Sequence, residues 1–562
     1  MKQSQFMNDD FNYDLLQDLK VTFVNMPLRE SAPPVVAPEG PALLASKLRQ
    51  FGANVTILDL NAYRIKDKYS EALGLNNGRH LTESEVEHYF LAHLNKYGEQ
   101  DLVALSGIIT TLRWQETFSK IVKKYQPYSF LVSGNGLATE IKFGLFNWIP
   151  ELDAIARSEG DDIILDIAKD VAIMKKYGKL SSILNNKVSK HYHGMYRGVH
   201  RFVYEGGRPS NLDEIPHPAW DLLQTDPFGK NILENYINVP IWGLAANNSS
   251  AAPFTMKRSL NTVSSRGCPY SCAFCYRGAQ GERNYGIRSA EKLAEQMMMY
   301  HDVYDLDFIG YVDDNFAVSK KRMKLLPQVF NDKNVYMRWG THTRMDEADE
   351  RLFPMSEAGC VYIGFGAESA HEQTLTRMKK GGFILRNGLE DVKVDGSDYQ
   401  FPATMTEAIR NCHRTGIHAN CTWIMGYPGE TLEHLKTSVA FIKWQQDIIE
   451  NGHVENNNEY TDVKNAINRS MFVATAYPGT AMFKEEKVVK ILKENFNITF
   501  DKNNDPVCDE NFHFYVSELD DATKVLNDKN GNPINFGEIP LDKFLLAREH
   551  IANNQVEKIL EI

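Results

Sequence analysis

The sequence predicts an α/β protein with two successive parallel-sheet units: a doubly wound sheet, then a partial barrel of six strand–helix units, followed by a mixed C-terminal region. Short apolar segments rich in valine and isoleucine alternate with helix-like segments, as buried parallel strands and their crossover helices do. This alternation lapses over residues 176–258 and then restarts. The length of 562 residues is sufficient for two or three such domains.

The first unit is expected over residues 20–175, after a polar tail at residues 1–19. Its strand candidates are 20–25, 54–60, 102–107, 129–134 and 153–157. A helix is predicted over 41–51, with Gly52 as its C-terminal stop. Doubly wound sheets bind ligands at the carboxyl ends of their strands, so that edge is the expected ligand site.

The second unit is expected over residues 259–480, after a connector at 176–258 rich in Gly, Pro, Asn and Asp. Its strand candidates are 261–265, 307–313, 335–344, 361–369, 419–426 and 470–476. Ser289 is a predicted N-cap, and Thr404 with Glu407 is a predicted capping box before 408–416. Six units form a partial barrel, since a full one needs eight. The remaining segments are insertions near 382–403 and 446–465 and a C-terminal region at 481–562.

Composition limits the classes of function. The net charge of −11 does not favour a nucleic-acid partner. No apolar run reaches the roughly 18 residues that a membrane span requires. The polar N-terminus lacks the apolar centre of a signal peptide, so we expect a cytoplasmic protein whose thiols stay reduced. Clustered cysteines in such a protein indicate metal binding rather than disulfides.

Three of the seven cysteines fall in one stretch of eight residues, 268-CPYSCAFC-275. Gly267 and Pro269 favour an irregular loop, and the loop follows a predicted strand. Thiolates suit zinc or iron–sulfur centres. Structural zinc normally has four protein ligands, and the other cysteines are scattered singly at Cys360, Cys412, Cys421 and Cys508. Three ligands without a fourth indicate a metal centre with one open position.

This stretch resembles the hallmark of the radical S-adenosylmethionine (SAM) superfamily, C-x3-C-x2-C with an aromatic residue before the last cysteine. The matching residues are Cys268, Cys272, Phe274 and Cys275. The resemblance implies that the thiolates hold a [4Fe–4S] cluster whose fourth iron binds the amino and carboxylate groups of SAM. It also implies an external one-electron reductant of the flavodoxin or ferredoxin type, and cleavage of SAM to a 5′-deoxyadenosyl radical.

Further residues of the predicted barrel match positions that the superfamily uses around SAM. Asp313 or Asp314 could accept hydrogen bonds from the SAM ammonium, or the pair is a helix cap or a solvated turn. Alternation along the third strand places His342 and Arg344 on one face. Arg344 could pair with the SAM carboxylate. His342 is either a proton donor near the substrate or a hydrogen-bonded core histidine.

The fourth barrel strand ends in 364-GFGAES-369. The resemblance places Glu368 and Ser369 near the ribose and amino end of SAM, with a structural salt bridge as the competing interpretation of Glu368. Glycines on the same face let a ligand approach the backbone. After the fifth strand, Glu430 in 426-GYPGET-431 is expected to be structural, as a helix cap.

Residues 20–175 resemble the Rossmann-like, cobalamin-binding-type domain that precedes many radical SAM domains. The segments 104-ALSGIITT-111 and 133-SGNG-136 resemble the loops beside the cobalamin tail. The implied cofactor-binding residues are Ser106, Gly107, Ser133, Gly134 and Gly136. The D-x-H-x-x-G motif, whose histidine ligates cobalt in many cobalamin proteins, is missing. The histidines of this region, His80, His88 and His93, are expected on the surface.

Three functions remain open from the sequence. The first is a cobalamin-dependent radical SAM methyltransferase that methylates an unactivated carbon of a small molecule. The second is a radical SAM cyclase or dehydrogenase whose N-terminal domain is vestigial. The third is a non-catalytic iron–sulfur electron-transfer or sensor protein, which the inward polar residues of the third and fourth strands disfavour. Methylthiotransferases are set aside because residues 1–267 contain no cysteine. Substrate specificity is expected in the two insertions and in the region from residue 481.

Overall fold

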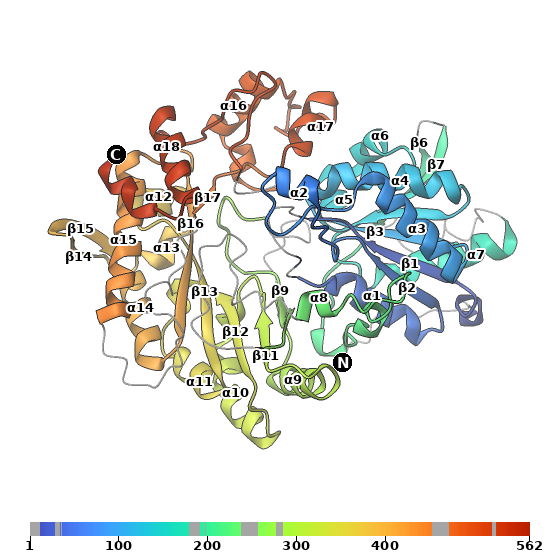
Figure 1. Cartoon of the computed structure of the whole chain (residues 1–562), viewed down its shortest axis with the longest axis horizontal. Helices are drawn as coiled ribbons and strands as arrows, with labels where there is room; N and C mark the ends of the chain where they lie inside the picture. The colour runs from blue at the N-terminus through green and yellow to red at the C-terminus, as the bar shows by residue number, and fades with distance from the viewer. Residues whose placement is uncertain are drawn as a thin grey trace.

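The computed structural model describes residues 12–28, 34, 36–178, 192–196, 198–237, 257–276, 285–451, 471–519 and 524–562. It contains two large sheets side by side, a mostly parallel N-terminal one on the right of Figure 1 and the parallel barrel sheet on the left. The C-terminal helices α16 (Glu486–Phe496) and α17 (Glu510–Ser517) lie above the junction between them (Figure 1).

The N-terminal sheet has the strand order β2-β1-β3-β4-β5-β7-β6. The predicted strands are present as β1 (Lys20–Asn25), β2 (Asn54–Asp59), β3 (Leu102–Ser106), β4 (Phe130–Gly134) and β5 (Ala154–Arg157). They are all parallel. Helix α1 (Glu39–Gln50) packs with α7 (Ile163–Tyr177), and α3 (Glu83–Tyr97) packs with α4 (Leu112–Tyr125). The doubly wound arrangement is therefore confirmed. Gly52, at φ +87°, follows α1 as predicted.

Two further strands occur where the sequence predicts only a connector. These are β6 (Tyr192–Tyr196) and β7 (Val199–Glu205). Strand β7 pairs in parallel with β5, and β6 pairs antiparallel with β7. The sequence pattern does not mark β7 as a strand, because β7 begins with two exposed residues and mixes charged with apolar side chains. Part of residues 176–258 therefore belongs to the N-terminal sheet.

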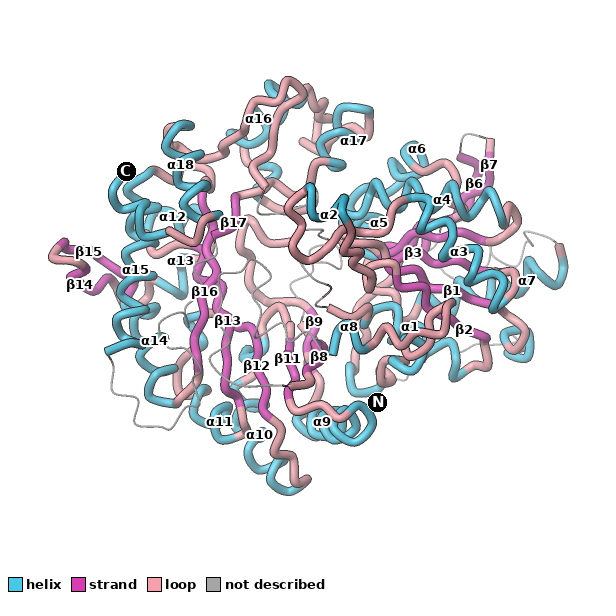
Figure 2. Tube along the Cα trace, viewed as in Figure 1, coloured by secondary structure: helices cyan, strands magenta, loops and turns pink. Residues whose placement is uncertain are grey.

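The second sheet has the order β17-β16-β13-β12-β11-β8, and all neighbours are parallel (Figure 2). The strands are β8 (Ser259–Thr262), β11 (Phe308–Tyr311), β12 (Arg338–Thr343), β13 (Cys360–Glu368), β16 (His418–Met425) and β17 (Met471–Val473). The helices between them are α9 (Ala290–Tyr304), α10 (Lys320–Asp332), α11 (Leu352–Glu357), α12 (Glu372–Arg377), α13 (Gly381–Ile384), α14 (Ala403–Thr415) and α15 (Leu432–Asn451). The six-unit partial barrel is confirmed.

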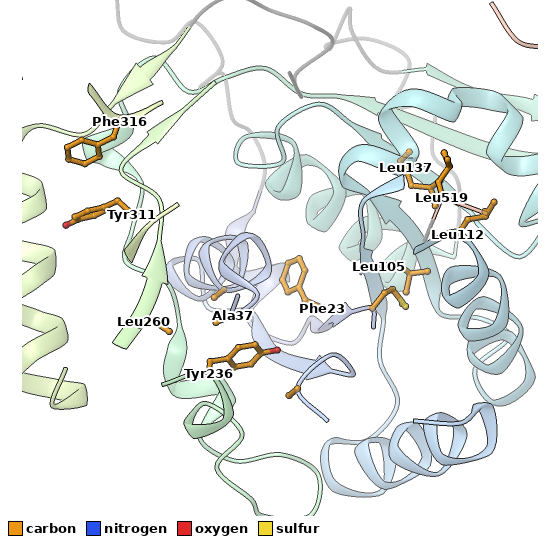
Figure 3. Close-up of a cluster of buried hydrophobic side chains, with 14 of the residues drawn as sticks. Phe23, Ala37, Leu105, Leu112, Leu137, Tyr236, Leu260, Tyr311, Phe316 and Leu519 are labelled. Carbon is orange, nitrogen blue, oxygen red and sulfur yellow. The ribbon is translucent and has the colours of Figure 1, made fainter. Parts of the chain in front are cut away.

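One continuous hydrophobic core joins the two units. Figure 3 shows Phe23 and Ala37 of the N-terminal unit near Tyr236 and Leu260, and all four belong to one cluster. Leu260 lies on β8, the first strand of the barrel sheet. All four side chains are buried. The units therefore form a shared interface, and a site between them has packed walls.

Of the two predicted helix N-termini, the one at Ser289 is confirmed and the one at Thr404 is wrong. Ser289 caps α9, because its side chain accepts from the Lys292 N–H at 3.1 Å. The capping box at Thr404 and Glu407 is wrong. Helix α14 begins earlier, directly after Pro402, whose fixed φ suits a helix start, and its N-cap has no side-chain hydrogen bond.

The first insertion folds into α13 and a hairpin of β14 (Leu389–Val394) and β15 (Ser397–Pro402). The second continues α15 to Asn451, and its remainder lies outside the described residues. The C-terminal region adds α16, α17 and α18 (Leu541–Ala552). Among the helices that the structure describes, none combines the length and hydropathy needed to cross a bilayer.

Candidate active site

The cysteine loop follows β8 and a two-residue strand, β9 (Ser265–Arg266), at the carboxyl edge of the barrel. Gly267 has φ +76°, a conformation that favours glycine where the chain turns into the loop. The structure brings the three thiols into one loop, at Cys268, Cys272 and Cys275. Other thiols, at Cys360, Cys412 and Cys421, are buried, and Cys508 is partly buried.

Backbone hydrogen bonds fix the middle of this loop to two other parts of the barrel. The buried Ala273 donates its N–H to Met378 O at 2.9 Å, and its carbonyl accepts from Met482 N at 2.7 Å. Met378 follows α12, and Met482 follows the last barrel strand. The loop position therefore depends on the segment after the central strand β13 and on the segment after the edge strand β17.

The two adjacent aspartates have different surroundings. Asp313 is buried, and its carboxylate accepts from Ser264 N (2.6 Å), Ser264 Oγ (2.5 Å) and Ser265 Oγ (2.7 Å). It therefore fixes the segment that leads into the cysteine loop. Asp314 is exposed and lines a cavity beside Gly267. Of the two, Asp314 is the carboxylate that faces open space.

Arg344 lies against the cysteine loop. Its Nη1 is 3.4 Å from Cys272 Sγ, and its guanidinium lies 4.0 Å from the centre of the Tyr270 ring. Its Nε donates to Asp346 Oδ1 at 2.9 Å. The side chain thus holds a positive charge next to a thiol of the loop, in a geometry fixed by a carboxylate and an aromatic face.

His342 lies on β12 against the bare backbone of the next strand. A Cβ on Gly364 would come within 2.5 Å of the imidazole Cδ2, so this glycine leaves the space that the ring occupies. Burial lowers the pKa of His342 to about 4, so the imidazole is neutral at physiological pH.

Glu368 and Ser369 point to opposite sides of the barrel sheet. Glu368 has φ +66°, an unusual conformation for a non-glycine residue, and its Oε1 is 3.1 Å from Lys380 Nζ. Lys380 Nζ also lies 6.0 Å from the centre of the Phe274 ring in the cysteine loop. Ser369 is fully buried, with its Oγ 3.4 Å from Ser438 Oγ on α15. The structure brings Glu368 and Phe274 together and places Ser369 in the helix layer.

Glu430 is structural as expected, although it does not cap the helix. It is fully buried, and its Oε2 accepts from Gly426 N at 2.5 Å, which closes the turn. Burial raises the pKa of Glu430 to about 8. The helix start is satisfied instead by Thr431, whose Oγ1 accepts from His434 N at 3.4 Å.

A cavity of about 590 Å³ lies at the carboxyl edge of the N-terminal sheet and extends to the barrel. The predicted residues that line it are Ser106, Gly107, Gly134 and Gly136. Ser133 faces the other way, where its buried Oγ donates to Gln115 Oε1 at 2.7 Å. Tyr276, which directly follows Cys275, also lines the cavity. The cavity and the cysteine loop are therefore adjacent.

Glu39, at the start of α1, connects the N-terminal unit to the barrel beside this cavity. It is largely buried, and its carboxylate accepts from Thr262 Oγ1 at 2.7 Å and Val263 N at 3.0 Å. A second link is a charge network in which Arg266 contacts Asp161 and Glu159. Both links fix the segment that precedes the cysteines.

Replacing Glu39 by glutamine is expected to flatten the pH dependence of stability. Burial raises the pKa of Glu39 from 4.5 to about 7, against the opposing effect of the Thr262 hydrogen bond. Between pH 4.5 and about pH 7, the Glu39 carboxyl of the native state therefore keeps a proton that the unfolded state has already released. The contribution of Glu39 to stability, about 3 kcal/mol, is fully present below about pH 4.5 and is lost as the pH rises through 7. Unfolding of both proteins at pH 5 and pH 8 measures this.

The control for Glu39→Gln is Glu71→Gln, which removes an exposed carboxylate. It should retain the pH slope of the unsubstituted protein. Equal slopes in the unsubstituted protein and the Glu39 variant would contradict the assignment.

The three histidines of the N-terminal unit were expected on the surface, and for His93 this is wrong. His93 is fully buried, and its Nε2 lies 2.9 Å from Thr22 Oγ1. His88 is exposed and stacks on Phe228 at 5.4 Å. His93 lies on α3, and the polar composition of this helix concealed its inward face.

The sequence did not reveal the charged and aromatic residues that join the two units. Among the residues at this junction, only Tyr276 could have been suspected from the sequence, because it directly follows the third cysteine. Glu39, Asp161 and Arg266 lie in ordinary local contexts, and only the tertiary structure brings them together.

Comparison with known proteins agrees with this geometry. Residues 262–442 match the radical SAM superfamily. The uncharacterized methyltransferase PH0819 of Pyrococcus horikoshii is 25% identical over 474 residues, which cover 83% of each chain. An anaerobic magnesium-protoporphyrin IX monomethyl ester cyclase of Rubrivivax gelatinosus is 23% identical over 354 residues, 62% of this chain and 55% of the cyclase. The chain therefore spans about half the length of that cyclase.

Two solved structures share the fold across most of the chain. The cobalamin-dependent SAM radical enzyme OxsB has a TM-score of 0.58 at 17% identity, covering 91% of this chain and 67% of OxsB. The radical SAM methyltransferase TsrM of Kitasatospora setae has a TM-score of 0.53 at 14% identity, covering 96% of this chain and 89% of TsrM. With its three-cysteine loop at the carboxyl edge of a six-unit barrel, the chain carries a radical SAM domain over residues 262–442 and is a radical SAM enzyme.

Proposed function

We propose that this protein is a cobalamin-dependent radical SAM methyltransferase that acts on an unactivated carbon of a small molecule. The observation that carries the proposal is the cavity of about 590 Å³ between the glycine-lined edge of the N-terminal sheet and the cysteine loop. Doubly wound sheets bind their ligands at this edge, and the cavity would bring such a ligand next to the cysteine loop.

The residues present fit a [4Fe–4S] cluster. Three thiols lie in one loop, and thiolates are the usual ligands of iron–sulfur centres. Arg344 Nη1 lies 3.4 Å from Cys272 Sγ, so a positive charge faces the negative charge that a thiolate-bound cluster would carry. When bound, the cluster supplies the electron that cleaves SAM reductively.

The residues at the sheet edge fit cobalamin. Gly134 and Gly136 line the cavity without side chains, so a large ligand can approach the backbone. Relatives support this choice, since solved structures of OxsB and TsrM contain cobalamin and two matched proteins are named as methyltransferases. When bound, cobalamin supplies the methyl group. The D-x-H-x-x-G motif is missing from this unit, so its histidine would not be among the residues that hold the cofactor here.

The chain's own residues would then orient SAM and keep the site dry. Asp314 offers a carboxylate to the SAM ammonium, and Arg344 offers a cation to the SAM carboxylate. Glu368 is held by Lys380 at the edge of the cysteine loop and would contact the ribose or amino end of SAM. His342, neutral at physiological pH, positions substrate by hydrogen bonding.

The test is anaerobic purification from cobalamin-supplemented cells, with iron and cobalt counted. We expect about four irons and one cobalt per chain for a single cluster and a single cobalamin, formation of 5′-deoxyadenosine from SAM after reduction, and methylated product. Cluster and 5′-deoxyadenosine without cobalt would contradict the cobalamin proposal and favour cyclisation or dehydrogenation. An intact cluster that never cleaves SAM would contradict both the cobalamin-dependent methyltransferase and the radical SAM enzyme without cobalamin. Because the thiols must stay reduced, we also propose that the enzyme works in the cytoplasm.

A further inference from the structure

We propose that four residues beside the cysteine loop, Arg377, Lys379, Phe383 and Arg386, form the docking surface for a small acidic one-electron carrier protein. We call these four residues the carrier surface. The inference rests on the proposed function, because a carrier is needed only if the loop holds a centre that must be reduced. It assigns the partner's docking site to a defined part of this chain.

The carrier surface belongs to a segment that packs directly against the cysteine loop. Between α12 and α13, Met378 O accepts the N–H of Ala273, which lies between two of the cysteines. The Phe383 ring lies edge-on to the Tyr270 ring of the loop, with ring centres 5.4 Å apart. A protein bound to this surface would therefore lie next to the thiols, and electron transfer slows steeply as the distance increases.

The surface combines exposed positive charge with an exposed aromatic ring. Arg377, Lys379 and Arg386 are exposed, and Phe383 is 52% exposed. Arg377 and Arg386 donate to the backbone carbonyls of Gly429 and Asp346, which leaves their charge in place.

The local acidic groups offset only part of this charge. Within the described parts of the chain, none of the three cations forms an ion pair with a carboxylate. Glu485 lies close enough for an electrostatic interaction with Lys379, and its Oε1 accepts from the Tyr427 hydroxyl at 3.0 Å. Glu372, on α12, is exposed to solvent.

The charge of the chain and of the carrier surface favours an acidic partner. The chain as a whole carries −11, so an acidic protein is repelled by most of its surface. A cationic patch on such a chain steers an acidic partner to one place, and a central aromatic ring supplies an apolar anchor. A nucleic acid would need a longer basic track than three cations around one ring. A flavodoxin- or ferredoxin-like protein fits this surface.

The step at this surface is a transfer of one electron. The reduced carrier loses one electron, the centre held by the cysteines gains it, and no bond forms or breaks between the two proteins. The oxidised carrier then dissociates and is reduced elsewhere by its own reductase.

The test compares the unsubstituted holoenzyme with Lys379→Glu/Arg386→Glu and with a control, Lys321→Glu/Lys324→Glu. The control makes the same charge change at two exposed lysines of α10. Binding of a reduced flavodoxin, and separately of a [2Fe–2S] ferredoxin, is measured by biolayer interferometry at low and high salt. Formation of 5′-deoxyadenosine is measured with each carrier and with dithionite.

We expect at least one carrier to bind the unsubstituted protein and the control, more weakly at high salt. The Lys379/Arg386 variant should lose about tenfold or more in carrier affinity and in carrier-supported rate. Its dithionite-supported rate should be unchanged. Equal carrier binding by that variant, an equal loss in the control, or binding of RNA in place of either carrier overturns the proposal. If dithionite yields no 5′-deoxyadenosine with the unsubstituted protein, the proposed function fails, whereas the binding comparison still decides the docking site.

Discussion

Replacing any one of Cys268, Cys272 or Cys275 by alanine is expected to reduce formation of 5′-deoxyadenosine from SAM to background. The three thiols are the donor set of one loop, and each removal leaves the proposed cluster with two protein ligands. Outer-shell partners of a metal site alone cost up to about 100-fold, so loss of a direct ligand should exceed that. Iron content, visible absorbance and product analysis of the anaerobically purified variants measure the effect.

A matched thiol control distinguishes loss of a ligand from general damage. Cys508 is partly buried and lies outside the cysteine loop, so Cys508→Ala should keep its iron and its SAM cleavage. A loop variant that retains full iron and forms 5′-deoxyadenosine at the normal rate would show that its thiol is not a ligand. Loss of iron in Cys508→Ala as well would indicate damage from which no ligand can be assigned.

The fold and the cysteine loop could be predicted because their signals are local. Buried parallel strands such as β3 and β13 have continuous apolar segments, and a three-cysteine loop is read directly from its spacing. The edge strand β6 and its neighbour β7 were not predicted, because partly exposed strands mix polar with apolar residues.

Side-chain direction within a site segment was harder to predict. Neighbouring residues at a strand end point to opposite faces, so a motif of several polar residues contributes only some of them to the site. Ser369 faces α15 while Glu368 faces the cysteine loop, and Ser133 faces Gln115 while Gly134 lines the cavity. Which face is inside depends on the packing of whole layers.

Contacts between the two units could not be predicted from one sequence. Glu39 and Thr262 are separated by 223 positions, and their hydrogen bond exists only because α1 and β8 meet at the shared interface. The same holds for the ion pair between Arg266 and Asp161. These residues determine how the cavity wall meets the cysteine loop, and the mechanism requires that position to be fixed.

Replacing Gly136 by leucine is expected to prevent cobalamin retention without changing the iron content. A Cβ at Gly136 would lie 3.7 Å from both Ile108 Cα and the Tyr276 ring, which are ordinary contacts, so alanine is accommodated. The additional carbons of leucine would occupy the cavity that Gly136 lines. Overpacking typically costs about 1–3 kcal/mol, which is about 5- to 150-fold in affinity, so cobalt per chain should fall about fivefold or more.

Gly136→Ala is the matched control and should keep both metals. Gly136→Leu should still cleave SAM to 5′-deoxyadenosine, because the cysteine loop keeps its backbone bonds to Met378 and Met482. Its methylated product should disappear, since that step alone depends on the cavity. Normal cobalt content in Gly136→Leu would mean that cobalamin does not approach this edge of the sheet, and the cavity would then be the substrate site of a radical SAM enzyme that needs no cobalamin.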